Sequence, residues 1–200
     1  MAQHKNKLPP SLLLNAYAQG GFPMSEDATD DDFFWVEPKM RGIIPFENFH
    51  VSRSLLKKIK KKPFDIYLDR DFLGVINGCA EEKTGRETTW INKTIKDAYY
   101  ELFKLGYCHT VEAWQDDKLV GGLYGISLGR AFFGESMFSR KTDASKICLV
   151  ILVQHLQKQG FILLDTQFIT PHLERFGAIE ISQKDYLELL NKALIDDATF

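Results

Sequence analysis

The spacing of hydrophobic residues changes several times along the chain between the period of a helix and that of a strand. Apolar residues three and four positions apart are typical of helices, whereas short apolar or alternating runs bounded by turn residues are typical of strands. The pattern predicts helices at residues 10–19, 53–62, 71–80, 89–105, 143–159, 171–176 and 182–194. It predicts strands at residues 33–36, 42–44, 64–68, 109–114, 119–126, 130–138 and 161–164. Together these elements predict an α+β fold, in which helices flank a mixed sheet.

Turn residues give some of these elements defined ends. Turns at 115–117 and 127–129 separate three strands, which we therefore expect to form an antiparallel meander. Asp143 is expected to cap the helix that follows it, and Gly160 to end that helix. Thr89 is expected to cap the helix that Gly106 closes.

Composition and charge narrow the class of protein. The 200 residues are 44% hydrophobic and 26% charged, as in a globular domain, and the net charge of −2 excludes a uniformly basic nucleic-acid binder. Cys79, Cys108 and Cys148 lie far apart, so we expect neither a disulfide framework nor a metal site. No apolar run is long enough to span a bilayer, and we expect a cytoplasmic protein.

Basic residues gather in one segment of this otherwise slightly acidic chain. Residues 53–62 contain six bases and no acid. A solvated helix face is one interpretation, and a patch that contacts nucleic-acid phosphates is the other. On the second interpretation, Arg53, Lys57 and Lys60 are the expected contacts.

Two segments place polar side chains among apolar ones. Glu135 stands between Gly134 and Ser136 in a strand rich in Phe, so it either faces solvent or points into a cleft. Asp165 and Gln167 end a buried strand, and the alternation of a strand puts both on one face. Such a strand end either forms a ligand crevice or caps the next turn.

Eight short motifs, taken together and in order, resemble the leucyl/phenylalanyl-tRNA–protein transferase family. The likeness covers the chain from about Leu8 to Leu190. The motifs are GFPM at 21–24, FHVSRS at 49–54, TWI at 89–91, HTVEAW at 109–114, LVGGLYG at 119–125, GESMFS at 134–139, ASK at 144–146 and LDTQ at 164–167.

The resemblance implies a fold and an activity. It implies a small N-terminal subdomain, here residues 1–62 with the basic segment that contacts tRNA, and an acetyltransferase-like catalytic domain at 63–200. The implied reaction moves Leu or Phe, and Met less well, from aminoacyl-tRNA to proteins that begin with Arg or Lys. The product is then marked for degradation by the N-degron route. We expect a monomer without a cofactor.

The resemblance also implies roles for individual residues. Asp165, acting through Gln167, would orient the amine and accept its proton, and we expect its side chain to contribute little to core packing. Glu135 would hold the basic side chain of the acceptor or the terminal ribose of the tRNA. The residues expected to bind the aminoacyl-adenosine end are Met24, Trp90, Leu123, Phe132 and Ser136.

Two departures from the family pattern and two other functions complete the sequence-based picture. Met24 and Leu123 replace the Trp and Met of some members, so we expect a more aliphatic pocket, and longer relatives carry about thirty more residues at the N-terminus. One alternative function is a CoA-dependent N-acetyltransferase, although the junction at 138–144 lacks the glycines that would hold a pyrophosphate. The other is a tRNA-binding module without catalysis.

Overall fold

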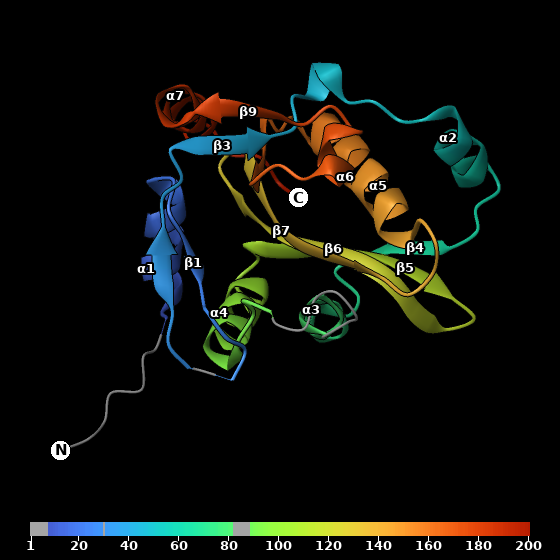
Figure 1. Cartoon of the computed structure of the whole chain (residues 1–200), viewed down its shortest axis with the longest axis horizontal. Helices are drawn as coiled ribbons and strands as arrows, with labels where there is room; N and C mark the ends of the chain where they lie inside the picture. Colours follow the sequence, from blue (N-terminus) through green and yellow to red (C-terminus); the bar gives the residue numbers. More distant parts are fainter. Residues whose placement is uncertain (1–7, 30, 82–88) are drawn as a thin grey trace.

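The computed structural model describes residues 8–29, 31–81 and 89–200, which form nine strands and seven α-helices in a layered arrangement (Figure 1). The strands are β1 (Phe22–Met24), β2 (Phe34–Val36), β3 (Met40–Ile43), β4 (Asp65–Leu68), β5 (Cys108–Gln115), β6 (Lys118–Leu128), β7 (Ala131–Ser139), β8 (Leu163–Gln167) and β9 (Ile179–Ser182). The helices are α1 (Pro10–Ala18), α2 (Arg53–Lys60), α3 (Phe72–Ala80), α4 (Lys93–Lys104), α5 (Ala144–Gln159), α6 (Pro171–Glu174) and α7 (Gln183–Ala193).

Seven of the strands form one sheet, in the order β4-β5-β6-β7-β8-β3-β9. Neighbouring strands are antiparallel except β7 and β8, which are parallel and are joined through α5. Strands β5, β6 and β7 form the antiparallel meander that the sequence predicts. The mixed α+β class is therefore confirmed.

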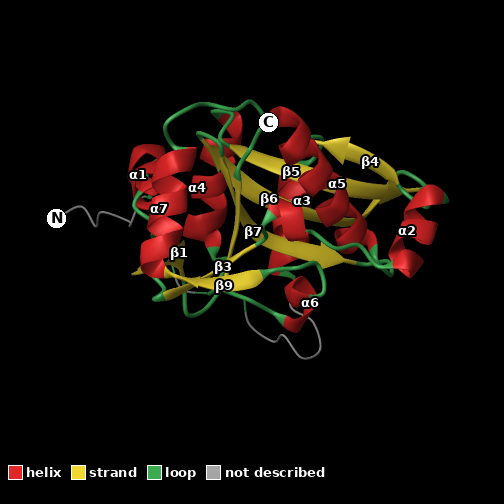
Figure 2. Cartoon of the chain, turned by 90° about the horizontal axis from the view of Figure 1, so that it is seen from above, coloured by secondary structure: helices red, strands yellow, loops and turns green. Residues whose placement is uncertain are grey.

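Helices cover both faces of this sheet (Figures 1 and 2). On one face α1, α3 and α4 contribute buried side chains such as Leu13, Val75 and Ile95 to a first hydrophobic cluster. On the other face α5 fills a second cluster, with Leu149, Val153 and their neighbours packed against β5, β6 and β7. None of the helices in the described ranges is long and apolar enough to cross a membrane.

The elements that the sequence analysis missed are short strands. β1 pairs with β2 in a separate two-stranded sheet, and β9 pairs with β3 at the edge of the large sheet. Strands of three or four residues leave too short a pattern for alternation to identify. Because β3 lies inside the large sheet, residues 40–43 pack with the part of the chain that we assigned to the catalytic domain. The boundary after residue 62 stays a prediction.

Two predicted helix caps differ from the structure. The N-cap of α4 is Asn92, whose side-chain oxygen accepts the Ile95 N–H at 2.9 Å, whereas Thr89 accepts the Ile91 N–H ahead of the helix. Asp143 does precede α5, but with a φ of 69° and no capping bond. Its carboxylate instead binds Lys58 and Lys146, each at 2.7 Å, because an ammonium is a stronger partner than a neutral amide.

A β-bulge in the middle of the meander determines where Glu135 lies. Gly125 pairs with Gly134 and Tyr124 pairs with Ser136, so Glu135 is the extra residue that faces no partner on β6. A bulge re-aims the side chains of its strand. Gly125 is required here, because a Cβ atom at this position would lie 2.3 Å from the Phe133 carbonyl oxygen and 2.4 Å from the Phe132 ring.

We therefore expect Gly125→Ala to lower the free energy of unfolding by about 3 kcal/mol, the upper end for overpacking, because the added Cβ atom meets backbone and a buried ring. Gly134→Ala is the matched control on the other strand of the same pair. Its Cβ atom would meet only the Asp165 carbonyl, at 3.4 Å, so the change should stay below about 1 kcal/mol. Urea unfolding of both variants checks this, and equal losses would contradict it.

Candidate active site

A cavity of about 310 Å³ opens where the two parallel strands of the sheet stop pairing. The parallel register of β7 and β8 ends at Phe133 and Asp165, and the residues that follow in each strand line the cavity. This volume lies at the lower end of the range for small-molecule sites. The lining residues are Phe22, Met24, Trp90, Leu123, Tyr124, Gly134, Glu135, Ser136, Met137, Leu149, Leu152, Leu164, Thr166, Gln167, Phe168, Thr170, His172 and Leu173.

Most of the predicted substrate-binding residues lie on this wall. The structure brings together Met24, Trp90, Leu123 and Ser136 around the cavity. Phe132 does not join them. It pairs with Leu164 before the strands separate, is fully buried, and stacks on Phe200 at 5.5 Å between ring centroids. Phe132 therefore belongs to the second hydrophobic cluster and not to the pocket wall.

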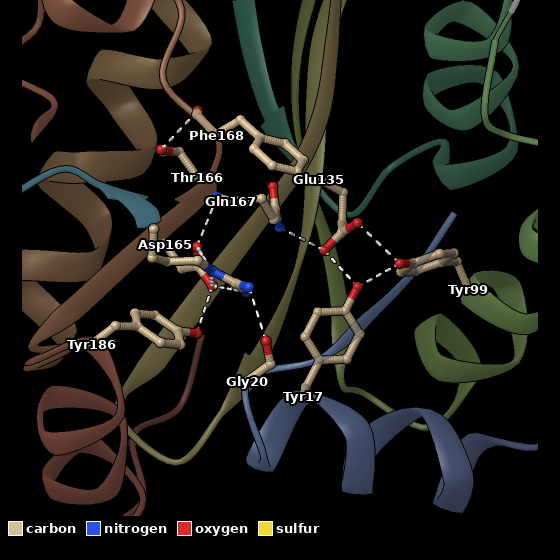
Figure 3. A network of polar contacts seen from close by, with 10 residues as sticks. Tyr17, Gly20, Tyr99, Glu135, Asp165, Thr166, Gln167, Phe168 and Tyr186 are labelled. Atoms are coloured by element: carbon tan, nitrogen blue, oxygen red, sulfur yellow. Dashed lines mark hydrogen bonds and ion pairs between the residues drawn. The ribbon is translucent and has the colours of Figure 1, made fainter. Parts of the chain in front are cut away.

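Glu135 is the carboxylate that reaches the cavity, and two buried tyrosines hold it in place (Figure 3). The Tyr17 hydroxyl donates to one of its oxygens at 2.7 Å, and the Tyr99 hydroxyl donates to the other at 2.9 Å. The Gln167 side-chain amide donates to the first oxygen at 3.1 Å. These partners come from α1, α4 and the end of β8, so Glu135 is fixed from three sides.

The protonation of Glu135 is coupled to this cluster. Burial raises the pKa of Glu135 from its ordinary value of 4.5 to about 7, against the opposing effect of the two tyrosine hydrogen bonds. Burial and the nearby Glu135 raise the pKa of both tyrosines, so the phenols stay protonated and donate. The Tyr17 and Tyr99 hydroxyls also lie within hydrogen-bond distance of each other. The two phenolic protons can serve only two of the three contacts among Tyr17, Tyr99 and Glu135 at one time.

Gln167 adopts a backbone conformation that non-glycine residues rarely have. Its φ is 55°, and the Phe168 N–H donates to the Thr166 carbonyl at 2.6 Å, so the chain reverses within three residues. Such turns cost on the order of 1–3 kcal/mol. A contact from Asp165 stabilises this turn, since its carboxylate accepts the Gln167 backbone N–H at 2.7 Å. The strained turn directs the Gln167 amide toward Glu135 (Figure 3).

Asp165 itself lies behind the cavity in a buried ion pair with Arg41. The Arg41 guanidinium donates to both carboxylate oxygens, at 2.9 and 2.6 Å, and Tyr186 donates to one of them at 2.7 Å. Arg41 also donates to the Gly20 carbonyl at 2.9 Å. The guanidinium lies between the rings of Phe22 and Tyr186, at 4.7 and 4.5 Å from their centroids. Asp165 is 0% exposed and Arg41 only 1%.

These contacts change how Asp165 is interpreted. Asp165 has its carboxylate saturated by three partners and does not line the cavity, so it can orient Gln167 but is not in reach of an incoming amine. The expectation that it contributes little to packing is wrong, because removing it would leave Arg41 buried without its counter-charge.

Four functional candidates gave no usable sequence signal. Arg41 lies in a four-residue strand 124 positions from Asp165, and nothing local marks its partner. Tyr17 and Tyr99 fit the apolar faces of their helices, so sequence spacing treats them as core residues. Phe168, which also lines the cavity, follows a turn that alternation does not predict.

Comparison with known families decides which group of proteins the chain belongs to. A profile of the leucyl/phenylalanyl-tRNA protein transferase matches residues 43–191, and a profile of the N-terminal domain of the same transferase matches residues 6–39. The chain belongs to the leucyl/phenylalanyl-tRNA protein transferase family. It is therefore an aminoacyltransferase, whose substrates are an aminoacyl-tRNA and a protein.

Solved structures resemble this chain only distantly. The PaiA N-acetyltransferase from Thermoplasma acidophilum, solved with coenzyme A, is 12% identical over 48% of this chain and 75% of its own, with a TM-score of 0.37. L-PGS from Bacillus licheniformis is 10% identical over 90% of this chain and 68% of its own, with a TM-score of 0.48. Neither likeness is close enough to bear on function.

The buried ion pair generates a prediction about stability. Asp165→Ala should lower the free energy of unfolding by about 3–5 kcal/mol, because the Arg41 charge stays buried and unpaired. Urea unfolding measures this loss. A change below about 1 kcal/mol, the size expected at an exposed position, would contradict the pairing.

A double variant separates stability from positioning. Arg41→Met with Asp165→Leu removes both charges, so it should regain much of the stability lost in Asp165→Ala. Aminoacyl transfer should stay impaired in the double variant, because the Gln167 N–H has lost its acceptor. Recovery of transfer together with stability would show that Asp165 does not position Gln167.

Proposed function

We propose that this transferase moves Leu or Phe, and Met less well, from aminoacyl-tRNA to the α-amino group of proteins that begin with Arg or Lys. The modified proteins would be marked for N-degron degradation. The observation that carries the proposal is a carboxylate with a pKa of about 7, Glu135, on the wall of an apolar cavity. A cytoplasmic monomer remains a prediction of the sequence alone.

The apolar lining supports a hydrophobic aminoacyl group. Met24, Trp90, Leu123 and Met137 offer flexible and aromatic surface, with no charge along that side of the cavity. Such pockets separate side chains by only about 1–3 kcal/mol per methylene, so a single pocket accepts Leu, Phe and Met alike. These three share an unbranched β-carbon, so a pocket narrow near that atom would exclude Ile and Val.

Glu135 is better placed than Asp165 to move the proton. The amine nitrogen attacks the ester carbonyl, a C–N bond forms, and the bond to the ribose oxygen breaks. An α-amine has an ordinary pKa of about 7.7–8.0, close to that of Glu135, and matched values favour proton transfer near neutral pH. Starting from the neutral amine, Glu135 takes a proton from the nitrogen as the C–N bond forms and gives it to the departing ribose oxygen. An α-amine that begins as the ammonium ion first releases its extra proton to solvent.

Gln167 and Ser136 supply neutral hydrogen bonds beside this carboxylate. The Gln167 amide already contacts Glu135 at 3.1 Å and lies on the cavity wall, so it can orient the ester or the amine. Ser136 neighbours Glu135 on the same wall. Because the ester is already activated, holding both reactants in line can contribute about 7–11 kcal/mol.

The outer face of α2 suits the tRNA body. Arg53, Lys57 and Lys60 are exposed there, and none of them forms an ion pair with another residue in the described ranges. The helix is fixed below by the buried side chain of Leu55 and by Ser52, whose hydroxyl accepts the Leu55 N–H at 3.3 Å. We propose that these three bases contact phosphates.

Two features count against the CoA-dependent alternative. The first N–H groups of α5, which would have to hold a pyrophosphate, are already bonded: Ala144 donates to the Lys141 carbonyl at 3.1 Å and Ser145 to the Ser139 hydroxyl at 2.9 Å. In addition, the junction at 138–144 contains no glycine that would let a pyrophosphate approach the backbone at the start of this helix.

The decisive test is transfer of labelled Leu from leucyl-tRNA to peptides that differ only in their first residue. We expect product with Arg or Lys first and none with Glu or Gly first. A non-catalytic tRNA-binding module would bind the tRNA but label no peptide, and an acetyltransferase would label peptides only from acetyl-CoA.

The raised pKa of Glu135 predicts the pH dependence of transfer. In the wild type, kcat should rise through a pKa near 7 as Glu135 loses its proton. Glu135→Gln should lose this step and lower kcat by about 10²–10⁴-fold, the usual contribution of a general base. Rates between pH 5.5 and 8.5 with a saturating donor test this, and an unchanged profile in Glu135→Gln would remove Glu135 from the reaction.

The titration of Glu135 should also affect stability, but in the opposite direction: the free energy of unfolding should fall as pH rises, whereas kcat rises. The folded-state pKa of about 7 exceeds the ordinary 4.5, so Glu135 favours folding below pH 4.5 and loses that contribution as pH rises toward 7. The difference is roughly 3 kcal/mol for a shift of this size. In Glu135→Gln this part of the pH dependence should vanish, which unfolding at pH 5 and pH 8 will show.

The α2 surface generates a prediction about salt. Replacing Arg53, Lys57 and Lys60 together by Ala should weaken tRNA binding and reduce the slope of log K against log salt by about 0.7–0.9 for each lost contact. The matched control replaces three exposed lysines elsewhere, Lys158, Lys184 and Lys192. If the slope of log K against log salt falls equally in both variants, the bases of α2 do not contact tRNA and α2 is an ordinary solvated helix.

A further inference from the structure

A second hollow of about 420 Å³ lies beside the cavity, between α2, the start of α5 and α6. We call it the cationic hollow. It is lined by Ser52, Ser54, Leu55, Lys58, Asp143, Lys146, His172, Arg175 and Phe176. Nothing in the reaction described above uses it.

Positive charge exceeds negative charge in the cationic hollow. Lys58 and Lys146 each bind one oxygen of Asp143, at 2.7 Å, so the single carboxylate holds two ammonium groups at fixed positions. Both lysines remain more than a third exposed, at 37% and 38%. Arg175 is exposed, and among the described residues it forms no ion pair. Three cations thus face one anion, and two positive charges are left in excess.

The cationic hollow connects the cavity to α2. His172 lines both spaces, and its Nε2 atom is buried with no hydrogen-bond partner among the described residues. On the opposite side, Ser52, Ser54 and Lys58 belong to α2 or its cap, the element whose outer face carries Arg53 and Lys57. A chain that starts in the cavity and continues to α2 therefore passes over the hollow.

We propose that the cationic hollow binds the phosphate on the 5′ side of the terminal adenosine of the aminoacyl-tRNA, while the aminoacyl group occupies the cavity. The proposal rests on the proposed function and names a subsite for its donor. Ammonium and guanidinium groups make charge-assisted hydrogen bonds to phosphate oxygens, and Ser52 and Ser54 add hydroxyl donors.

Charge argues for the donor rather than the acceptor at this place. An acceptor that begins with Arg or Lys carries two positive charges at its N-terminus, and the cationic hollow would repel it. Phosphodiester groups are the anions that follow directly after the ester in the donor. The carboxylate of Asp143 is compatible with this role, because it fixes Lys58 and Lys146 and leaves their exposed sides toward the hollow.

The test compares two minimal donors, leucyl-adenosine with a free 5′-hydroxyl and the same molecule with a 5′-phosphate, in transfer to an Arg-initial peptide. The readout is the ratio of their kcat/KM values, so a loss that affects both donors cancels. The wild type should favour the phosphorylated donor about ten-fold or more, the size of one charge-assisted contact. Arg175→Gln combined with Lys146→Gln should bring the ratio near one, whereas Lys192→Gln on α7 should keep it.

Each outcome decides the question. A ratio near one in the wild type, or an equal ratio in wild type and double variant, overturns the subsite. A preference that follows acidic residues in the acceptor peptide instead of the donor phosphate also overturns it and assigns the hollow to the acceptor. Absence of transfer from both donors in the wild type, with full-length leucyl-tRNA also inactive, would refute the proposed function itself.

Discussion

The buried pair of Arg41 and Asp165 is the interaction on which the arrangement of the site depends. Removing two charges from water costs several kcal/mol for each ion, and their attraction offsets this only when the geometry is good and the remaining polar atoms are bonded. Here every requirement is met: Asp165 accepts from Arg41, Tyr186 and the Gln167 backbone, and Arg41 also reaches the Gly20 carbonyl. The pair therefore ties β3, β8, α7 and the end of α1 to one point.

Two carboxylates close together do different work because their surroundings differ. Asp165 has a guanidinium against both oxygens and is sealed from the cavity. Glu135 is met only by neutral donors, two phenols and an amide, and stands at the cavity wall, so burial raises its pKa to about 7. Gln167 joins them, with its backbone bonded to one carboxylate and its side chain to the other. A fixed charge thus positions the amide that contacts a titrating group.

The sequence predicted the parts of the site that are local, and missed the parts that depend on distant contacts. Motifs in order marked Glu135, Gln167, Met24 and Trp90, all of which line the cavity. The alternation that put Asp165 and Gln167 on one face assumes a regular strand, whereas Gln167 has a φ of 55° and ends it in a turn. Phe132 was predicted to line the pocket but lies in the core. Strand composition does not show where β7 and β8 cease to pair, and Phe132 comes before that point. No local pattern marks Arg41, because its role depends on an ion pair with Asp165, which is 124 positions away in the sequence.

The strained backbone of Gln167 places its side-chain amide at the point where β7 and β8 stop pairing. The parallel pairing of β7 and β8 ends at Phe133 and Asp165, and the cavity lies directly beyond that point. The chain reverses at Gln167 beside this space. The hydrogen bond from the Gln167 N–H to Asp165, roughly 1.5–3 kcal/mol for a contact with a charged group, offsets a strain of about 1–3 kcal/mol. The cavity, the Gln167 amide and the buried ion pair are therefore linked by direct contacts: Arg41 holds Asp165, Asp165 holds the Gln167 backbone, and the Gln167 side chain lies on the cavity wall. For a reaction whose ester is already activated, a rigid placement of this kind is what the protein has to supply.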